Sequence, residues 1–325
     1  MALKPKPLFI LAPMDDVTDT VFRQLVSSCA KPDLCFSEFV NVDGLMSPGR
    51  ARLLPKLERA IDEPPFVAHI WGAKPENFET IAEQIASGSL ACEIGNKTGF
   101  AGIDLNMGCP AKTVLKSGTC AGLIKTPDLA AEIIAATKRG NKGRLPLGVK
   151  TRLGFEKIDP EWTQFLLSSG IDMLSIHLRT VKELSLVPAH YDELTRIVEE
   201  RDRLSPSTIL IANGDILTRA QGEQLIEKYG IDGVMIGRGV FHDPYVFAQS
   251  SPWQDTSKAE RIGLFAKQLS LYIDWAQNPD KEVRRLNKYA KIYINGFDGA
   301  KEMREKLALA NKVSQLQEII KSYQI

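Results

Sequence analysis

The sequence has no excess of either charge and few cysteines. Its 41 Lys and Arg residues stand against 40 Asp and Glu residues, so the formal net charge of the 325-residue chain is +1. A near-neutral chain argues against indiscriminate electrostatic binding to nucleic acid, while a local basic region stays open. The five cysteines are odd in number and form no Cys-x-x-Cys pair, which argues against a disulfide framework and a zinc site. We therefore expect a metal-free protein of the reducing cytoplasm.

Long hydrophobic runs are also missing. No window approaches the roughly 18 apolar residues of a membrane span, and the apolar stretch at 8–13 is too short for the core of a signal peptide. A hydrophobic content of 44% with 25% charged residues is typical of a globular protein and excludes disorder. We expect a protein that does not bind membranes and that is a monomer.

Short β-rich runs, each ending in a polar or Gly-containing loop, recur along the chain. There are eight: Leu8–Ala12, Cys35–Val40, Phe66–Ile70, Gly102–Asn106, Leu147–Lys150, Met173–His177, Ile209–Asn213 and Gly233–Ile236. Helical periodicity fills most of the intervals, as in Pro75–Ser87, Pro127–Lys138, Asp192–Arg203 and Thr218–Lys228. This alternation predicts an α/β fold of the (β/α)8 TIM-barrel type, for which about 250 residues is typical. A doubly wound open sheet is the alternative, although it would normally have fewer strands.

The pattern changes after His242-Asp-Pro244 to long amphipathic segments. These segments are Lys258–Gln277, Lys281–Asn295, Gly299–Leu309 and Ser314–Tyr323. They predict a C-terminal helical bundle. We expect a catalytic domain over residues 1–249 and a helical domain over residues 250–325.

Polar side chains follow the predicted strands at their carboxyl ends, where barrels of this type build their active sites. Lys150 and Arg152 are two residues apart, as are His177 and Arg179, so each pair faces one side if the strand continues. Burying such groups without partners costs free energy, so their convergence favours a bound anion.

Glycine-rich turns follow the last two predicted strands, where barrels commonly bind phosphate. They are Asn213-Gly214 and Gly237-Arg238-Gly239. The alternative is that these are turn glycines without a ligand.

Cys109 follows the fourth strand, between a Gly and a Pro that hold its loop toward the mouth. With a reference pKa of about 8.5, its thiol is mostly protonated at neutral pH and can donate a proton. An inert buried thiol is the alternative.

Six motifs occur in order along the predicted barrel: Leu11-Ala-Pro-Met14, Leu105-Asn-Met-Gly-Cys-Pro110, Val149-Lys-Thr-Arg-Leu-Gly154, His177-Leu-Arg-Thr180, Ala212-Asn-Gly-Asp215 and Ile236-Gly-Arg-Gly239. Together they resemble the tRNA-dihydrouridine synthase family. Residues 287–304 resemble that family's helical domain, so the resemblance covers nearly the whole chain.

The resemblance implies an FMN enzyme that reduces the C5=C6 bond of specific uridines in tRNA, with NADPH reducing the flavin. Hydride would pass from flavin N5 to uracil C6, and Cys109 would donate the proton to C5. The implied cofactor contacts are Pro13, Met14, Asp15, His69, Lys150, His177, Asn213, Gly214, Asp215, Gly237 and Arg238. The implied substrate contacts are Asn106, Arg152, Arg179, Arg284, Arg285, Lys288 and Lys291, of which Arg179 suits the cofactor equally well.

Some positions depart from the family's usual pattern. His69 stands where a Gln usually contacts the flavin ring, and Asp16 and Leu178 stand where Gly is usual. The segment Gly118-Thr-Cys-Ala-Gly122 brings a second thiol, Cys120, near the catalytic loop. We interpret Cys120 as a packing residue, with a redox role as the alternative.

Charge is distributed unevenly along the chain. Residues 255–325 hold 13 Lys and Arg against 9 Asp and Glu, a charge of +4, whereas residues 1–254 carry −3. Within 281–312 the counts are 9 and 4, a charge of +5. The cations at 281–291 recur at three- and four-residue spacing and can share a helix face, with Tyr289 and Tyr293 nearby. By itself this pattern favours a solvated helix face, whereas the resemblance to the family implies contacts with tRNA phosphates.

Two other functions fit parts of these patterns. A flavin-barrel reductase of a free pyrimidine, similar to dihydroorotate dehydrogenase, would share the phosphate site but have no use for a basic tail. A non-catalytic tRNA-binding relative would explain the departures at His69, Asp16 and Leu178.

Overall fold

A closed parallel barrel forms the first part of the structure, a computed structural model that describes residues 7–281 and 283–323. The strands lie in the order β2-β1-β9-β8-β7-β6-β5-β4-β3, and β2 also pairs with β4, which closes the sheet. They are β1 (Leu8–Leu11), β2 (Leu34–Phe36), β3 (Val40–Asn41), β4 (Phe66–Trp71), β5 (Gly102–Met107), β6 (Leu147–Arg152), β7 (Met173–His177), β8 (Ile209–Asn213) and β9 (Gly233–Ile236). Since β2 and β3 pair with successive parts of β4, they fill one barrel position. The predicted (β/α)8 TIM barrel is confirmed.

The second barrel position is interrupted, which corrects the single strand expected over Cys35–Val40. At Ser37 the amide still donates to the Val67 carbonyl. The Ser37 hydroxyl, however, accepts the His69 amide at 2.8 Å and donates to the Glu38 carbonyl. A side chain therefore takes the place of a backbone acceptor, and the chain leaves the ladder before β3 begins.

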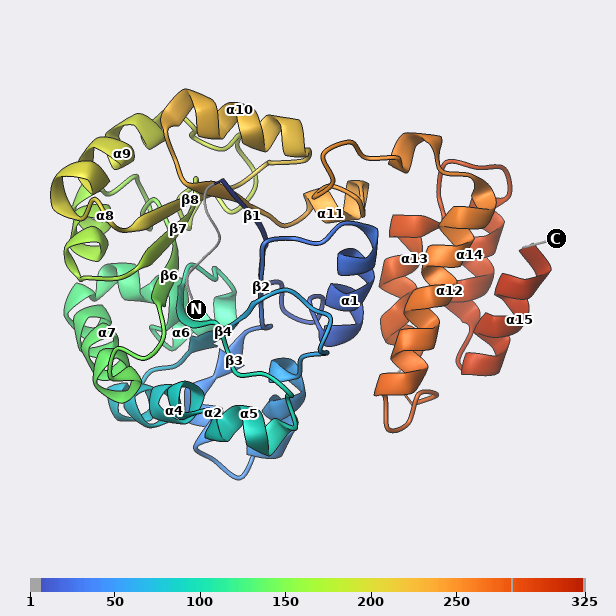
Figure 1. Ribbon diagram of the computed structural model, residues 1–325, viewed down its shortest axis with the longest axis horizontal. Coiled ribbons are helices and arrows are strands. Elements are labelled where there is room, and N and C mark those ends of the chain that lie inside the picture. The colour runs from blue at the N-terminus through green and yellow to red at the C-terminus, as the bar shows by residue number, and fades with distance from the viewer. Residues whose placement is uncertain (1–6, 282, 324–325) are drawn as a thin grey trace. The chain divides into compact units, whose positions relative to one another are not determined.

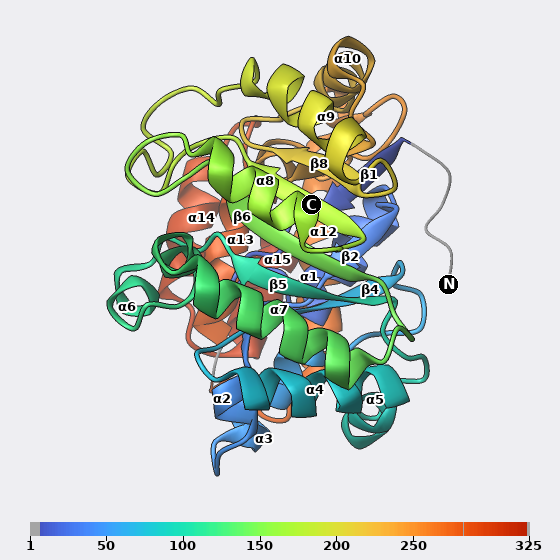
Figure 2. The same ribbon diagram turned by 90° about the vertical axis from the view of Figure 1, so that its left-hand side faces the viewer.

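Helices cover the outside of the barrel (Figures 1 and 2). The longer ones are α4 (Pro75–Ser87), α7 (Pro127–Asn141), α8 (Pro160–Ser168), α9 (Glu193–Leu204) and α10 (Arg219–Tyr229). Three of them begin with a proline, whose fixed φ and missing N–H suit the first turn. Shorter segments are α2 (Val42–Leu45), α3 (Arg50–Leu53), η1 (Leu54–Leu57), α5 (Ser89–Ile94), α6 (Lys112–Lys116) and η2 (Cys120–Lys125).

The interior of the barrel changes from apolar to polar along the strands. Its core cluster contains Leu8, Ile10, Ala12, Leu34, Phe36, Val67, Met173, Ile211 and Met235. Because side chains on one face of a strand recur every second residue, Val67 is followed on the same side by His69, and Ile211 by Asn213. Polar groups thus gather at the carboxyl end of the barrel.

The remaining helices form a second compact unit, which comprises residues 21–31 and 240–325, while the barrel unit comprises the chain up to Thr20 and residues 32–239. Its elements are α1 (Thr20–Cys29), α11 (Gly239–His242), η3 (Trp253–Asp255), α12 (Lys258–Trp275), η4 (Val283–Leu286), α13 (Asn287–Tyr293), α14 (Ala300–Leu309) and α15 (Val313–Tyr323). The predicted C-terminal helical region is present. Among the described residues, none of the helices is both long and apolar enough to cross a membrane.

The basic segment of this unit differs from the single helix expected over Lys281–Asn295. A 3-10 turn, η4, leads into the short helix α13, and residue 282 lies outside the described part of the chain. Tyr289 and Tyr293 are 3% and 0% exposed, and the Tyr289 ring stacks on Phe22 of α1 with centroids 5.2 Å apart. The tyrosines therefore belong to the core of the helical unit and do not face RNA.

Candidate active site

The strand register places the polar residues of β5 to β8 side by side. Asn106 lies opposite Lys150, Arg152 opposite His177, and His177 opposite Asn213. The Lys150 ammonium donates to Asn213 Oδ1 at 3.2 Å, and burial together with the Arg152 charge lowers the pKa of Lys150 to about 8. A lysine whose charge is this poorly compensated favours an anionic ligand.

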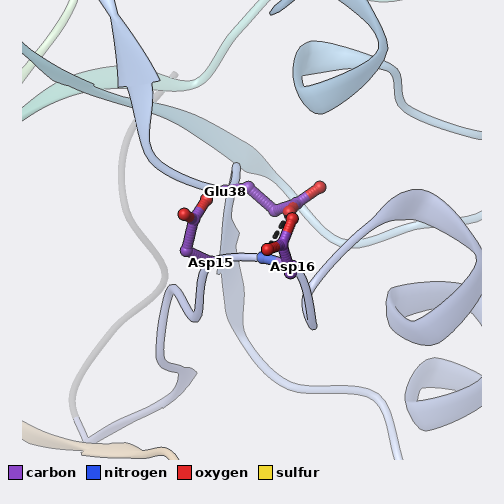
Figure 3. Close-up of side chains that lie close together, drawn as sticks. All are labelled: Asp15, Asp16 and Glu38. Atoms are coloured by element: carbon purple, nitrogen blue, oxygen red, sulfur yellow. Dashed lines mark hydrogen bonds between the residues drawn. The ribbon is translucent and has the colours of Figure 1, made fainter. Parts of the chain in front are cut away.

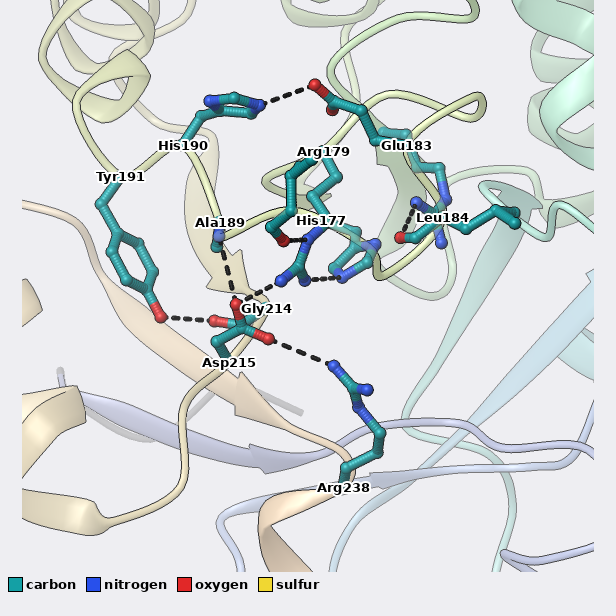
Figure 4. A network of polar contacts seen from close by, with 12 residues as sticks. His177, Arg179, Glu183, Leu184, Ala189, His190, Tyr191, Gly214, Asp215 and Arg238 are labelled. Carbon is teal, nitrogen blue, oxygen red and sulfur yellow. Dashed lines mark hydrogen bonds and ion pairs between the residues drawn. The ribbon is translucent and has the colours of Figure 1, made fainter.

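A second group of charges surrounds Asp215 (Figure 4). Its carboxylate pairs with the Arg179 guanidinium and, at 3.1 Å, with the Arg238 guanidinium. The φ of +50° at Asp215 and of +125° at Gly214 turns the chain there, and the Tyr191 hydroxyl donates to the Gly214 carbonyl at 2.6 Å. The acidic side chain is thus used to hold two arginines at the mouth of the barrel.

His177 lies among these cations as an uncharged ring. Burial, reinforced by the charges of Arg152 and Lys150, lowers its pKa to about 2. Its Nε2 atom lies 3.3 Å from Arg179 Nη1. Since a guanidinium can only donate, Nε2 accepts this hydrogen bond and the ring proton resides on Nδ1.

Arg152 joins two loops. Its Nε donates to the Gly108 carbonyl beside Cys109, and its Nη1 donates to the carbonyls of Thr180 and Leu184, all at 3.0 Å. The side chain is 6% exposed, and burial lowers its pKa to about 10. The strand period placed Arg152 beside Lys150, and the family resemblance implied a substrate contact there, but neither predicted this link between loops.

The loop that carries Cys109 is shaped by Asn106. Its Oδ1 atom accepts the amides of Gly108 and Cys109 at 3.1 and 3.0 Å, which fixes a tight turn at the end of β5. A Cβ on Gly108 would lie 3.2 Å from the Thr151 backbone, so this close approach favours glycine. Burial raises the pKa of the half-buried Cys109 thiol and keeps it protonated at neutral pH.

A pocket of about 310 Å³ opens beside the thiol. Asp15, Lys56, Trp71 and Cys120 line it together with Cys109. The Cys120 side chain is buried, burial strongly raises its pKa, and its φ is +51°. Burial and the raised pKa suit an unreactive thiol that packs in the pocket wall, and the packing role stays our interpretation.

The end of β1 contributes backbone, sulfur and carboxylates. Pro13 is buried and Met14 half-buried, and a Cβ on Gly237 would lie 3.8 Å from the Met14 sulfur, so the ends of β1 and β9 meet.

Three acidic side chains lie close together beside this strand end. Asp15, Asp16 and Glu38 have carboxylate oxygens within 4.8 Å of one another (Figure 3). The Lys56 ammonium lies 2.5 Å from Asp15, 3.9 Å from Asp16 and 3.7 Å from Glu38 and supplies their counter-charge. At Asp16 the φ of +56° explains why glycine suits this position.

Several buried polar atoms face the interior without a partner among residues 7–281 and 283–323. They are His69 Nε2, Asp104 Oδ1, Asn106 Nδ2 and Ser175 Oγ. Each unsatisfied buried group costs about 1–3 kcal/mol, so a polar ligand that pairs with several of them is favoured. Sequence reasoning missed Asp104 and Ser175, although the period of two places them on the same side as Asn106 and His177.

The fold and this site define a TIM-barrel enzyme with a cationic mouth and a protonated thiol at the end of β5. Sequence comparison identifies the family. The family model for dihydrouridine synthase (Dus) matches residues 10–324, so the chain belongs to the dihydrouridine synthase family.

Individual relatives agree with this assignment. A protein named "Probable tRNA-dihydrouridine synthase" from Staphylococcus aureus (strain COL) is 45% identical over 323 residues, which cover 98% of this chain and 94% of the relative. "Probable tRNA-dihydrouridine synthase 2" from Bacillus subtilis (strain 168) is 40% identical, covering 98% of this chain and 95% of the relative. Among solved structures, a complex of 2-naphthoyl-CoA reductase with 2-naphthoyl-CoA matches with a TM-score of 0.51 at 14% sequence identity. The match covers 74% of this chain and 49% of the reductase chain, and it shows a likeness in fold alone.

Proposed function

We propose that this protein is an FMN-dependent tRNA-dihydrouridine synthase, which reduces the C5=C6 bond of specific uridines in tRNA with NADPH as the reductant. The family membership and the names of the relatives support the reaction. The observation that carries the proposal is the protonated Cys109 thiol beside a barrel mouth that is cationic and contains unpaired polar atoms.

The residues at the mouth fit FMN. An isoalloxazine ring has an apolar end and a polar edge, and the interior offers apolar residues on β1, β2 and β9 and unpaired polar atoms on β4, β5 and β7. Pro13, Met14, Asp15, His69, Lys150 and His177 would hold the ring, and Asn213, Gly214, Asp215, Gly237 and Arg238 the phosphate end. Once reduced by NADPH, bound FMN would supply the hydride for uracil C6.

Cys109 would donate the proton to uracil C5, with Asn106 shaping the loop beneath it. A proton donor must hold its proton at the working pH, and burial raises the pKa of this thiol. Lys150, whose pKa is about 8, is mostly charged at neutral pH and would stabilise negative charge that develops next to it during the reaction. Arg152 and Arg179 would border the uracil while also holding the loops around it.

The helical region would bind the tRNA. Arg284, Lys288 and Lys291 are exposed and Arg285 is half-buried, so these side chains can reach phosphates. Residues 1–249 would act as the catalytic domain and residues 250–325 as the tRNA-binding domain. The target uridine must leave its stack to enter the barrel. We propose that the protein acts in the cytoplasm as a monomer without a metal.

The test compares Cys109→Ala with Cys92→Ala, a matched change at an exposed cysteine of α5. We expect Cys109→Ala to bind FMN and oxidise NADPH slowly but to form at most about 1% of the dihydrouridine, as for the loss of a general acid. Cys92→Ala should match the wild type. The measurement is dihydrouridine mapped across tRNAs from cells lacking the protein and complemented with each variant. Full product formation by Cys109→Ala would refute the proton-donor role, and unchanged tRNAs in the deletion strain would refute the function.

A further inference from the structure

His69 and Asp104 form a buried pair in the interior of the barrel. The two residues lie opposite each other in the register of β4 and β5, and both side chains are 0% exposed. His69 Nδ1 lies 2.6 Å from Asp104 Oδ2. A carboxylate accepts and cannot donate, so Nδ1 carries the proton and Nε2 is left as the second polar atom of the ring.

The surroundings of this pair hold it in one place. The His69 ring lies edge-on to Phe36 at 6.0 Å and beside Phe39 at 5.1 Å, and its amide is held by the Ser37 hydroxyl. On the other side, a Cβ at Gly148 of β6 would lie 2.5 Å from Asp104 Oδ1. Asp104 therefore occupies space that exists because residue 148 has no side chain.

The pair is incomplete within the protein. His69 Nε2 and Asp104 Oδ1 are buried without a hydrogen-bond partner among the described residues. Lys150 interacts electrostatically with the Asp104 carboxylate. Burying the Asp104 carboxylate costs free energy even with His69 beside it and Lys150 nearby. This cost favours a functional reason for an acidic residue at this position.

We infer that Asp104 is a positioning residue for the cofactor: by holding His69 through Nδ1, it presents Nε2 to a hydrogen-bonding atom on the polar edge of bound FMN. This inference rests on the proposed function, because it requires a flavin at the barrel mouth. It assigns a role to Asp104, which touches the His69 ring and acts through it. It also explains how a histidine can contact the flavin at this position, because the Asp104 carboxylate fixes the orientation of a ring that could otherwise rotate.

The test is a double-mutant cycle on FMN binding to apoprotein, with Asp104→Asn, His69→Gln and the double variant. We expect Asp104→Asn to weaken FMN binding about tenfold, which corresponds to about 1.4 kcal/mol. In the His69→Gln background the same change should matter less than about twofold, because no ring is left to position. Gly148→Ala should reproduce the loss by displacing Asp104, and it serves if Asp104→Asn does not fold.

The reduction potential of bound FMN supplies a readout that a merely structural role would not move. Asp104→Asn removes a buried negative charge, so reduction becomes easier. We expect the affinity for reduced FMN to rise at least about tenfold relative to that for oxidised FMN, a shift of about 30 mV for two electrons. Glu200→Gln, the same kind of change at a buried carboxylate of α9, should leave both the affinity and the potential unchanged.

The outcomes separate the inference from the proposed function. Wild-type apoprotein that binds no FMN would refute the function and with it the premise of the inference. Wild-type protein that binds FMN, with Asp104→Asn having no effect or the same effect in both backgrounds, would refute the inference alone. An unchanged potential in Asp104→Asn would also refute it.

Discussion

At the scale of one residue, Lys150 shows that a functional group can lower the folding stability of the protein. Its side chain is half-buried and lies near the Arg152 charge, and burial is the main cause of its lowered pKa of about 8. Below pH 8 the folded protein carries this charge at its full cost. Between about pH 8 and 10.4 the unfolded chain binds more protons than the folded one, so the stability contribution of this group improves as the pH rises.

We therefore predict that Lys150→Met stabilises the apoprotein at pH 7 by about 1–3 kcal/mol and that this gain shrinks toward pH 10. The measurement is urea unfolding at both pH values, with FMN affinity in parallel. Lys142→Met, at an exposed lysine, is the control and should show no such dependence. A gain that is equal at both pH values would contradict the assignment of the effect to the buried charge.

At the scale of elements, the Arg152 side chain links the loop after β5 to the loop after β7. Its three acceptors are the carbonyls of Gly108, Thr180 and Leu184. Leu184 has a φ of +53°, an unfavourable conformation for a leucine that the surrounding bonds must hold. A lysine has no planar fork and cannot reproduce these bonds from one position.

We predict that Arg152→Lys lowers kcat for dihydrouridine formation at least about tenfold, because a misplaced proton donor is costly, while FMN affinity changes less than about threefold. Hydrogen exchange should become faster at residues 180–190. Arg196→Lys, on α9, is the matched control. If kcat were unchanged while exchange increased, the loop would be mobile without consequence for the reaction.

At the scale of the whole molecule, the near-neutral net charge combines a barrel region of −3 with a C-terminal region of +4. We predict that the triple change Arg284→Gln, Lys288→Gln and Lys291→Gln weakens tRNA binding and reduces the slope of log K against log salt by about 2–3, as expected for three lost phosphate contacts.

The control for this prediction removes the same charge elsewhere. Lys97, Lys142 and Lys228 are exposed lysines of the barrel unit, and changing all three to Gln should leave the salt slope unchanged. FMN binding should be equal in both triple variants. Equal losses of tRNA affinity in the two would show that total charge, and not the segment at 284–291, governs binding.

The sequence by itself determined the strands, the carboxyl ends that form the mouth, and the loop around Cys109, because strand period and turn chemistry depend on neighbouring residues. It could not determine that Ser37 would break a strand, that Tyr289 would stack on Phe22, or that His69 would meet Asp104. These contacts join residues 32, 267 and 35 positions apart. Only the closure and register of the barrel, and the packing of α1 with the C-terminal helices, brought them together.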